Sequence, residues 1–321
     1  MTTYKEIYGT NVEVLASDPT NPVEGQIWYN STSQTLKGYA LVAGSWATAG
    51  PLNTARSETT GCGTQTAGLC MGGADPSVTG ATELYNGTSW TSSPNSMNTG
   101  RRRPSGTGNQ TAALVFAGLV SPGPVVANNE SWNGTSWTEV GDLNAARFGL
   151  GAAGTNTAAL GFGGADSPDP AATELWNGTS WTEVNNLNTG RNSLGGCGAT
   201  NTAALAFGGS GPTGATETWN GTSWTTSPAT LNTARTQLAG AGIQTAALAF
   251  GGNSGPVIMA NTESWNGTSW SQTDEMNTAR STLGGAGTQT LGLAFGGTPP
   301  LTGATEEWSG PAVQTVNITV S

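Results

Sequence analysis

The sequence offers few side chains that are suited to a catalytic centre. It contains no histidine, which removes the commonest general base and the commonest ligand for copper. Cys-x-x-Cys, phosphate-binding and dinucleotide-binding motifs are also absent. The remaining candidates are acidic residues in expected loops, where a pair of carboxylates would suit glycosidic cleavage: Asp75, Asp166, Asp169, Asp274 and Glu275. Loop acids are usually solvated, so we predict no catalytic residue, no metal site and no cofactor, with a carbohydrate-active enzyme as an alternative.

Most basic residues belong to one repeated motif. The segment LNTAR recurs as MNTGR, LNAAR, LNTGR, LNTAR and MNTAR, and a glutamate recurs with it. The two sets are Arg56, Arg101, Arg147, Arg191, Arg235 and Arg280, and Glu83, Glu130, Glu174, Glu217, Glu263 and Glu306. Because buried charges need partners, we expect each Arg to bond backbone carbonyls or the repeated Glu between neighbouring units. The alternative is a ring of arginines that lines a central axis and holds an anion.

The spacing of this motif predicts the elements that position it. Successive arginines are 45, 46, 44, 44 and 45 residues apart, and a period in the mid-forties fits the four strands of a β-propeller blade. Within one unit, TAALAFGG (residues 245–252) places Leu248 and Phe250 on one side of a strand and alanines on the other. Asn-Gly between the third and fourth strands favours a type I′ hairpin.

The aromatic residues predict how the chain closes. The third strands carry Tyr85, Trp132, Trp176, Trp219, Trp265 and Trp308, and the fourth strands carry Trp46, Trp90, Trp137, Trp181, Trp224 and Trp270. Trp308 and Trp46 each lack a partner within their own unit, so we expect the segment around Trp46 to complete the last blade beside Trp308. The predicted fold is therefore an all-β, six-bladed propeller of four-stranded antiparallel blades, the last closed by an N-terminal strand. A seventh, incomplete blade built from residues 25–50 is the alternative.

The repeat unit resembles the kelch family. The resemblance rests on Gly-Gly after the second strand (Gly208-Gly209, Gly251-Gly252), the third-strand aromatic, the fourth-strand Trp and the following Arg, and it covers residues 41 to about 310. The third turn reads Asn-Gly-Thr-Ser, and the second unit has Ala117-Gly118 in place of Gly-Gly, which departs from the common kelch pattern. PVEGQIWYNSTSQTLKGY together with NGTSW and LNTAR repeats is similar to kelch-like proteins of marine tailed phages. That likeness implies a virion role.

Two segments flank the predicted propeller. Residues 1–40 are an expected attachment segment, residues 41–310 form the propeller, and residues 311–321 are a strand-like tail. The tail segment PAVQTVNITV is expected to pair with GQIWYN or TLKGYA. Both ends leave the predicted propeller from the side that carries the constant turns. The loops between second and third strands lie on the other side and vary in length.

Variable loops on a rigid scaffold are where binding tends to occur, although drift in unimportant loops explains variability equally well. Arg102 and Arg103 break the repeat and are either a solvated pair or a partner contact. The candidate binding residues are Asp75, Arg102, Arg103, Val125, Val126, Asp166, Asp169, Val257, Ile258, Met259 and Leu301.

Charge and cysteine usage narrow the partners. The net charge of −10 argues against nucleic acid, and neither a secretory signal nor an apolar span for a membrane is visible. Three cysteines exclude a full disulfide framework. Cys62 and Cys197 are expected as small buried residues, with a Cys62–Cys70 bridge as the alternative.

We therefore expect a non-enzymatic virion protein, tail- or capsid-associated and made in the host cytoplasm, that presents one propeller face for host-surface recognition. Its expected partners are other virion proteins, bound through the two tails, and a host glycan or protein, and self-association into a homo-oligomer stays open. A purely structural decoration or connector protein is the alternative, and a cytoplasmic adaptor is disfavoured because no adaptor domain accompanies the repeats.

Overall fold

All regular structure in the protein is β-strand. The computed structural model describes residues 12–165 and 171–319, and within these ranges it contains strands and turns but no helix. Accordingly, no helix in the described ranges is long and apolar enough to cross a membrane. The all-β class is confirmed. The chain divides into two compact units, Met1–Gly44 with Gly310–Ser321, and Ser45–Ser309.

The second unit is built from four-stranded antiparallel sheets, six of them in its described part. In chain order they contain β5 (Thr60–Thr64), β6 (Ala67–Met71), β9 (Thr82–Tyr85) and β10 (Trp90–Ser92); β11 (Ser105–Asn109), β12 (Ala112–Phe116), β13 (Asn129–Trp132) and β14 (Trp137–Val140); β15 (Gly151–Gly154), β16 (Ala159–Phe162), β17 (Thr173–Trp176) and β18 (Trp181–Val184); β19 (Gly195–Thr200), β20 (Ala203–Phe207), β21 (Thr216–Trp219) and β22 (Trp224–Thr226); β23 (Ala239–Ile243), β24 (Ala246–Phe250), β27 (Thr262–Trp265) and β28 (Trp270–Thr273); and β29 (Gly284–Gly287), β30 (Leu291–Phe295), β31 (Thr305–Ser309) and β4 (Ser45–Ala49).

Alternating side chains explain how neighbouring sheets pack. Leu248 and Phe250 of β24 enter one buried cluster, whereas Ala247 and Ala249 enter the cluster on the other side of the same strand. Each sheet is therefore buried on both faces. Glycine in the first strands allows neighbouring sheets to approach closely, since a Cβ at Gly240 would lie 2.6 Å from the ring of Phe207 in the preceding sheet.

Strand β4 joins a sheet whose other strands lie far away in the sequence. It pairs with β31, with Trp46 opposite Trp308 and Ser45 opposite Ser309. The Trp46 and Trp308 rings are 5.6 Å apart. Residues 27–42 fall in the other unit, so the segment 25–50 is divided between two units.

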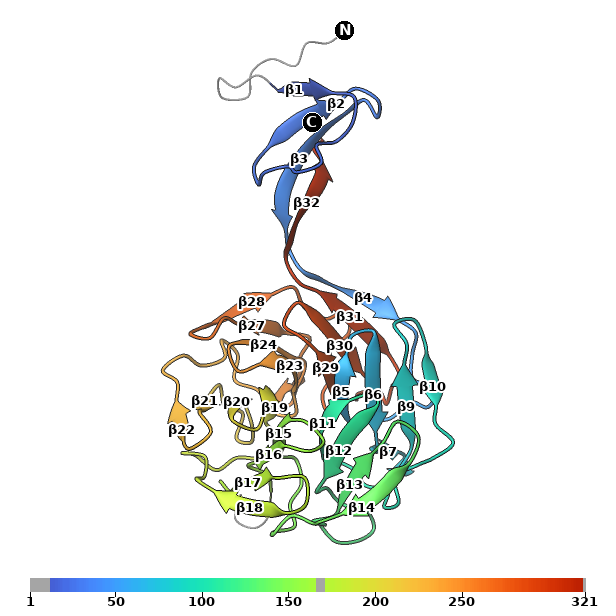
Figure 1. The fold of residues 1–321 in the computed structure, drawn as a ribbon, viewed down its shortest axis with the longest axis vertical. Helices are drawn as coiled ribbons and strands as arrows, with labels where there is room; N and C mark the ends of the chain where they lie inside the picture. The colour runs from blue at the N-terminus through green and yellow to red at the C-terminus, as the bar shows by residue number, and fades with distance from the viewer. Residues whose placement is uncertain (1–11, 166–170, 320–321) are drawn as a thin grey trace. The chain divides into compact units, whose positions relative to one another are not determined.

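The six sheets are arranged around a common centre (Figure 1). Their first strands are neighbours in the order β5, β11, β15, β19, β23 and β29, and β29 also packs against β5. Fourth-strand tryptophans link adjacent sheets, because in five of the six described sheets the indole Nε1 donates to a threonine hydroxyl of the preceding sheet at 2.9–3.0 Å. These pairs are Trp90–Thr305, Trp137–Thr82, Trp224–Thr173, Trp270–Thr216 and Trp46–Thr262.

One tryptophan departs from this pattern. The Nε1 of Trp181 has no hydrogen-bond partner in the described structure. The preceding sheet carries Asn129 where the other sheets carry threonine, and the Oδ1 of Asn129 is also buried without a partner. This pair is a defect in an otherwise regular set of contacts.

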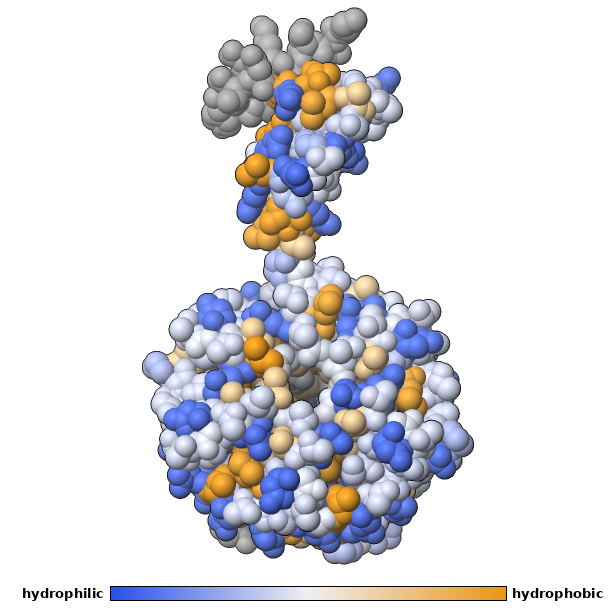
Figure 2. Space-filling model, in the orientation of Figure 1, coloured by the Kyte–Doolittle hydropathy of each residue, from blue (hydrophilic) through white to orange (hydrophobic). Residues whose placement is uncertain are grey.

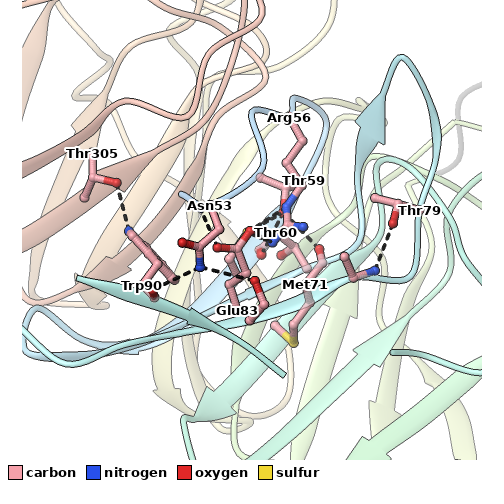
Figure 3. Close-up of polar contacts among 12 residues, drawn as sticks. Asn53, Arg56, Thr59, Thr60, Met71, Thr79, Glu83, Trp90 and Thr305 are labelled. Atoms are coloured by element: carbon pink, nitrogen blue, oxygen red, sulfur yellow. Dashed lines mark hydrogen bonds and ion pairs between the residues drawn. The ribbon is translucent and has the colours of Figure 1, made fainter. Parts of the chain in front are cut away.

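The repeated arginines and glutamates form buried ion pairs within each sheet. The Arg side chains are 0–2% exposed, and Arg–Glu distances run from 2.7 to 3.2 Å. In the first sheet, Glu83 bonds both Arg56 and the backbone N–H of Asn53, and Asn53 Nδ2 donates to the carbonyl of Trp90 (Figure 3). The expected pairing holds, but it joins the Arg to the third strand of its own sheet rather than to a neighbouring unit. The alternative anion-binding ring is wrong, because these guanidinium groups are buried and paired.

The three cysteines are buried and free. Cys62 lies opposite Leu69 and Cys70 lies opposite Gly61, so the two thiols are not cross-strand partners. The alternative bridge is therefore wrong. Cys70 instead accepts hydrogen bonds from Nε and Nη2 of Arg56 at 3.4 and 3.2 Å.

The first unit contains a mixed four-stranded sheet in the order β1 (Glu13–Leu15), β2 (Ile27–Asn30), β3 (Thr35–Val42) and β32 (Ala312–Asn317). Strand β32 pairs with β3, which confirms the expected pairing of the tail with TLKGYA. Asp18 holds this unit together by accepting bonds from Lys37 Nζ (2.7 Å), Asn30 Nδ2 (2.7 Å) and Trp28 Nε1 (3.0 Å). These three bonds lower the pKa of Asp18 to about 2, and the bond from Lys37 has the largest effect.

Candidate functional site

A cycle of backbone hydrogen bonds lies where the segments leading into the six first strands meet. The cycle contains one residue from each of these six segments. Each of these residues donates its backbone N–H to the backbone carbonyl of the equivalent residue before the preceding sheet, with N···O distances of 2.7–3.1 Å. The last member, Thr282, accepts from Glu58 and so completes the cycle. We call these residues the backbone cycle: Glu58, Arg103, Gly149, Ser193, Gln237 and Thr282. The main chain thus holds five different polar or charged side chains and one glycine in equivalent places.

Every member of the backbone cycle has a left-handed conformation, with φ between 51° and 66°. Glycine adopts this conformation freely, but it is uncommon for other residue types and costs about 1 kcal/mol or more for each. Five of the six members are not glycine. The hydrogen-bond cycle supplies the interaction that keeps these residues in this conformation.

The backbone cycle borders a central cavity of about 150 Å³. The lining also includes the starts of the first strands, such as Thr60, Gly106 and Gly240. The space-filling view shows the molecule hollowed at the centre of the sheets (Figure 2). A buried water needs at least roughly 10–15 Å³ of such space, so the cavity has room for several waters or one compact ligand.

One side of the cavity carries a charged cluster. Glu58 Oε1 accepts a hydrogen bond from Arg103 Nε at 2.6 Å, and Glu58 Oε2 accepts one from Arg102 Nη1 at 3.3 Å. The guanidinium of Arg103 also lies 5.8 Å from the centre of the Phe148 ring. Glu58, Arg103 and Phe148 come from the entries to three successive sheets, so the cluster bridges them. We call Glu58, Arg102, Arg103 and Phe148 the charged cluster.

This cluster carries the exposed positive charge of the second unit. The six repeated arginines are buried, whereas the side chains of Arg102 and Arg103 are 36% and 28% exposed. Two arginines and one glutamate leave a formal charge of +1 in a chain of net charge −10. An anion that approaches the second unit would therefore be attracted to this place.

The charged cluster lies beside the variable loops. The loop after each second strand forms a β-bridge with the segment that leads into a first strand, for example Ser57 with Ala74, Arg102 with Leu119 and Phe148 with Ala165. The two kinds of connection are therefore on the same side of the sheets, as the sequence predicts. The variable loops and the backbone cycle belong to one face.

The other candidate binding residues lie in separate loops. Asp75 is half-buried on β7 (Ala74–Asp75), which pairs with β8 (Ser77–Val78), and Val125 forms a bridge with Leu119 of its own loop. Val257 is 56% exposed on β26 (Val257–Ile258), which pairs with β25 (Asn253–Ser254). The remaining described candidates are the half-buried Val126, Ile258 and Met259 and the exposed Leu301. Asp166 and Asp169 lie outside the described residues.

The charged cluster contains two of the predicted residues and two that the sequence did not single out, Glu58 and Phe148. A signal for the backbone cycle was available, because each member lies two residues after a repeated Arg. That position differs in all six repeats and, with the residue before it, follows directly on the nearly constant LNTAR motif. The acidic candidates for glycosidic cleavage are dispersed by comparison: Asp75 lies in the first sheet's loop, and Glu275 accepts a bond from Asn261 in the fifth.

The comparisons with known proteins add no assignment to this geometry. No protein-family model matches the chain. No curated protein is significantly similar to it in sequence. The function must therefore be argued from the site itself.

Proposed function

We propose that Ser45–Ser309 is a closed six-bladed, kelch-like β-propeller and that the protein is a non-enzymatic recognition protein of a virion. In this proposal β4 completes the last blade. The pairing of Trp46 with Trp308, the Trp–Thr bonds between adjacent sheets and the completed backbone cycle all support closure. Closure stabilises such a fold because it leaves no unpaired sheet edge at the junction of the chain's ends.

The observation that carries the recognition role is the break in symmetry at the cavity. Six equivalent backbone positions carry five kinds of polar or charged side chain and one glycine. A purely architectural repeat would have no reason to vary there and to place its exposed arginines together. Variable side chains on a rigid scaffold suit the binding of an asymmetric partner.

The first unit is the proposed attachment element. The chain passes between the two units twice, between Val42 and Ser45 and between Ser309 and Ala312. These two connections are neighbours, because Ser45 is opposite Ser309 and Val42 is opposite Ala312. The crossings replace the Asn-Gly-Thr-Ser turn that joins third and fourth strands in the other sheets. The kelch-like resemblance to proteins of marine tailed phages favours a tail- or capsid-associated position in a virion, where other virion proteins would hold this unit.

Binding of the labelled full chain to cells of a candidate host tests the recognition role. We expect saturable binding that falls at least tenfold when Arg102 and Arg103 are both changed to alanine. Lys37→Ala is the control, because it removes a positive charge from the first unit; the bond to Asp18 that it also breaks lies within that unit, so binding by the second unit should be unchanged. Equal binding by the double variant and the wild type would refute the role of the charged cluster.

The location is tested separately. Mass spectrometry of purified particles should find the chain, and deletion of residues 1–40 and 311–321 should abolish its incorporation. Retained incorporation of the deletion variant would contradict the assignment of the first unit as the attachment element.

A further inference from the structure

We propose that the central cavity binds a carboxylate carried by a small polyhydroxylated group, such as a sugar acid, and that Arg103 is the residue that holds it. This inference rests on the proposed recognition function and names the ligand class for the same face. It starts from the way in which Arg103 is held.

The guanidinium of Arg103 is fixed but not saturated. Its Nε is bonded to Glu58 at 2.6 Å, its backbone N–H is bonded to the carbonyl of Glu58 at 2.7 Å, and its side chain faces the Phe148 ring. In the described structure no hydrogen bond occupies its two terminal nitrogens, and the side chain is 28% exposed. A planar guanidinium with two free parallel N–H groups matches the geometry of a carboxylate.

The charge balance favours an anion at this place. Glu58 is shared by two arginines, so it orients Arg103 while the cluster keeps a formal charge of +1. A carboxylate ligand would bring the cluster to neutrality. Because the site is partly enclosed, the attraction is screened less than at an exposed surface.

The rest of the lining is uncharged and mixes polar side chains with apolar ones, such as Leu150, Leu194 and Leu238. Ser193, Gln237 and Thr282 belong to the backbone cycle, and Thr59, Thr60 and Ser105 lie next to it along the cavity. Ser105 and Thr282 already donate to the backbone carbonyls of Leu150 and Ser281, so their oxygens would serve as acceptors for the hydroxyls of a sugar. The cavity of about 150 Å³ is smaller than typical pockets for drug-sized ligands, which are roughly 300–1,000 Å³. It therefore fits one sugar unit rather than a long oligosaccharide.

The test is calorimetric titration of the full chain with sodium glucuronate and, as the uncharged control, with glucose. We expect glucuronate to bind and glucose to bind at least tenfold more weakly. Arg103→Ala should weaken glucuronate binding about ten- to hundredfold, since it removes hydrogen bonds to a charged group. Arg103→Lys keeps the charge but loses the two parallel N–H groups and should give an intermediate loss.

Arg102→Ala is the comparison variant, because Arg102 carries the same charge and bonds the same Glu58 but does not line the cavity. It removes the net charge of the cluster and keeps the guanidinium of the cavity, so we expect a loss clearly smaller than that of Arg103→Ala. Equal losses in Arg102→Ala and Arg103→Ala would mean general attraction only and would overturn the proposal. Thermal melting of each variant checks that it is folded, and Arg103→Lys keeps the test decisive if Arg103→Ala unfolds.

Two further probes distinguish the possible sources of the carboxylate, and a cell-binding measurement distinguishes failure of the carboxylate site from failure of the recognition function. A short glycan ending in glucuronate that binds more tightly than free glucuronate supports a glycan source, whereas equal affinity supports a free sugar acid. An acidic peptide that binds when both sugars fail overturns the proposal in favour of a protein ligand. If Arg103→Ala still binds cells, the carboxylate site is overturned and the recognition function stands. If the wild-type chain binds glucuronate but not cells, the recognition function is overturned and the carboxylate site stands.

Discussion

Removing the charge of Glu174 should destabilise the protein far more than removing a similar charge from its surface. Glu174 Oε1 accepts from Arg147 Nη2 at 2.7 Å, and Oε2 accepts from the backbone N–H and the Nδ2 of Asn144 at 2.8 and 2.7 Å. The Arg147 and Glu174 side chains are 0% and 2% exposed. In Glu174→Gln the guanidinium would stay buried and would lose the counter-charge that Glu174 supplies.

The structure supplies both the magnitude and the control. Breaking a buried ion pair by removing one partner costs about 3–5 kcal/mol, which for a unit of this size corresponds to a fall in melting temperature of roughly 6–15 °C. Glu183 lies directly opposite Glu174 on the neighbouring strand but is exposed. Glu183→Gln should change stability by less than about 0.5 kcal/mol.

The assay is thermal unfolding followed by near-ultraviolet circular dichroism at one fixed scan rate. A third variant, Arg147→Met with Glu174→Leu, removes the whole pair and should recover most of the lost stability, because buried pairs are often replaceable by apolar residues. If Glu174→Gln melts within 2 °C of Glu183→Gln, the reasoning that these pairs are desolvated and mutually dependent is refuted.

Three other predictions follow from particular contacts. Asn129→Thr should restore the missing Trp–Thr bond and stabilise the protein by about 1 kcal/mol in the same melting assay, whereas an unchanged or lower melting temperature would show that Trp181 is satisfied by another group. Because the pKa of Asp18 is lowered to about 2 in the folded chain, its stabilising effect on the first unit should be complete above about pH 4 and lost as the pH falls through about 2. The indole N–H resonance of Trp28 reports this loss, and an identical pH response in Asp18→Asn would contradict it. Burial raises the pKa of Cys62 and of Cys197 to about 12, so neither thiol should react with a disulfide reagent at pH 8 until denaturant is added; prompt reaction of the native protein would contradict their burial.

The sequence predicts most of the strand architecture because, in every repeat, residue types alternate between the two faces of each strand. The period of the arginines, the alternation in TAALAFGG and the unpaired Trp46 and Trp308 are all patterns of residue type, and each corresponds to a pairing or a buried cluster in the structure. The tail could be assigned to TLKGYA for the same reason. The small hairpins β7–β8 and β25–β26 were missed, since two-residue strands leave too short a pattern to recognise.

The candidate site was harder to predict because its geometry depends on the main chain. Left-handed conformations at Glu58, Arg103 and Gln237 have no marker in residue type, as glycine occurs at only one of the six positions. The partner of Arg103 is Glu58, 45 residues away, and no local pattern joins them. The prediction that each Arg pairs with a Glu was correct, but the prediction that the pair joins neighbouring units was wrong. A buried Arg indicates that a charged partner is needed, but residue type does not indicate which sheet provides it.

In the backbone cycle, main-chain hydrogen bonds hold the centre of the second unit together, and the side chains at the same six positions are left to determine a ligand. The bonds of the cycle use only amide and carbonyl groups, so an exchange of side chain at any of its six places leaves the scaffold's own links intact. Under the proposed recognition function, one or two substitutions at these positions would change the ligand that is bound while the framework stays the same. A library randomised at Ser193, Gln237 and Thr282 would be a natural starting point for redirecting it to another ligand.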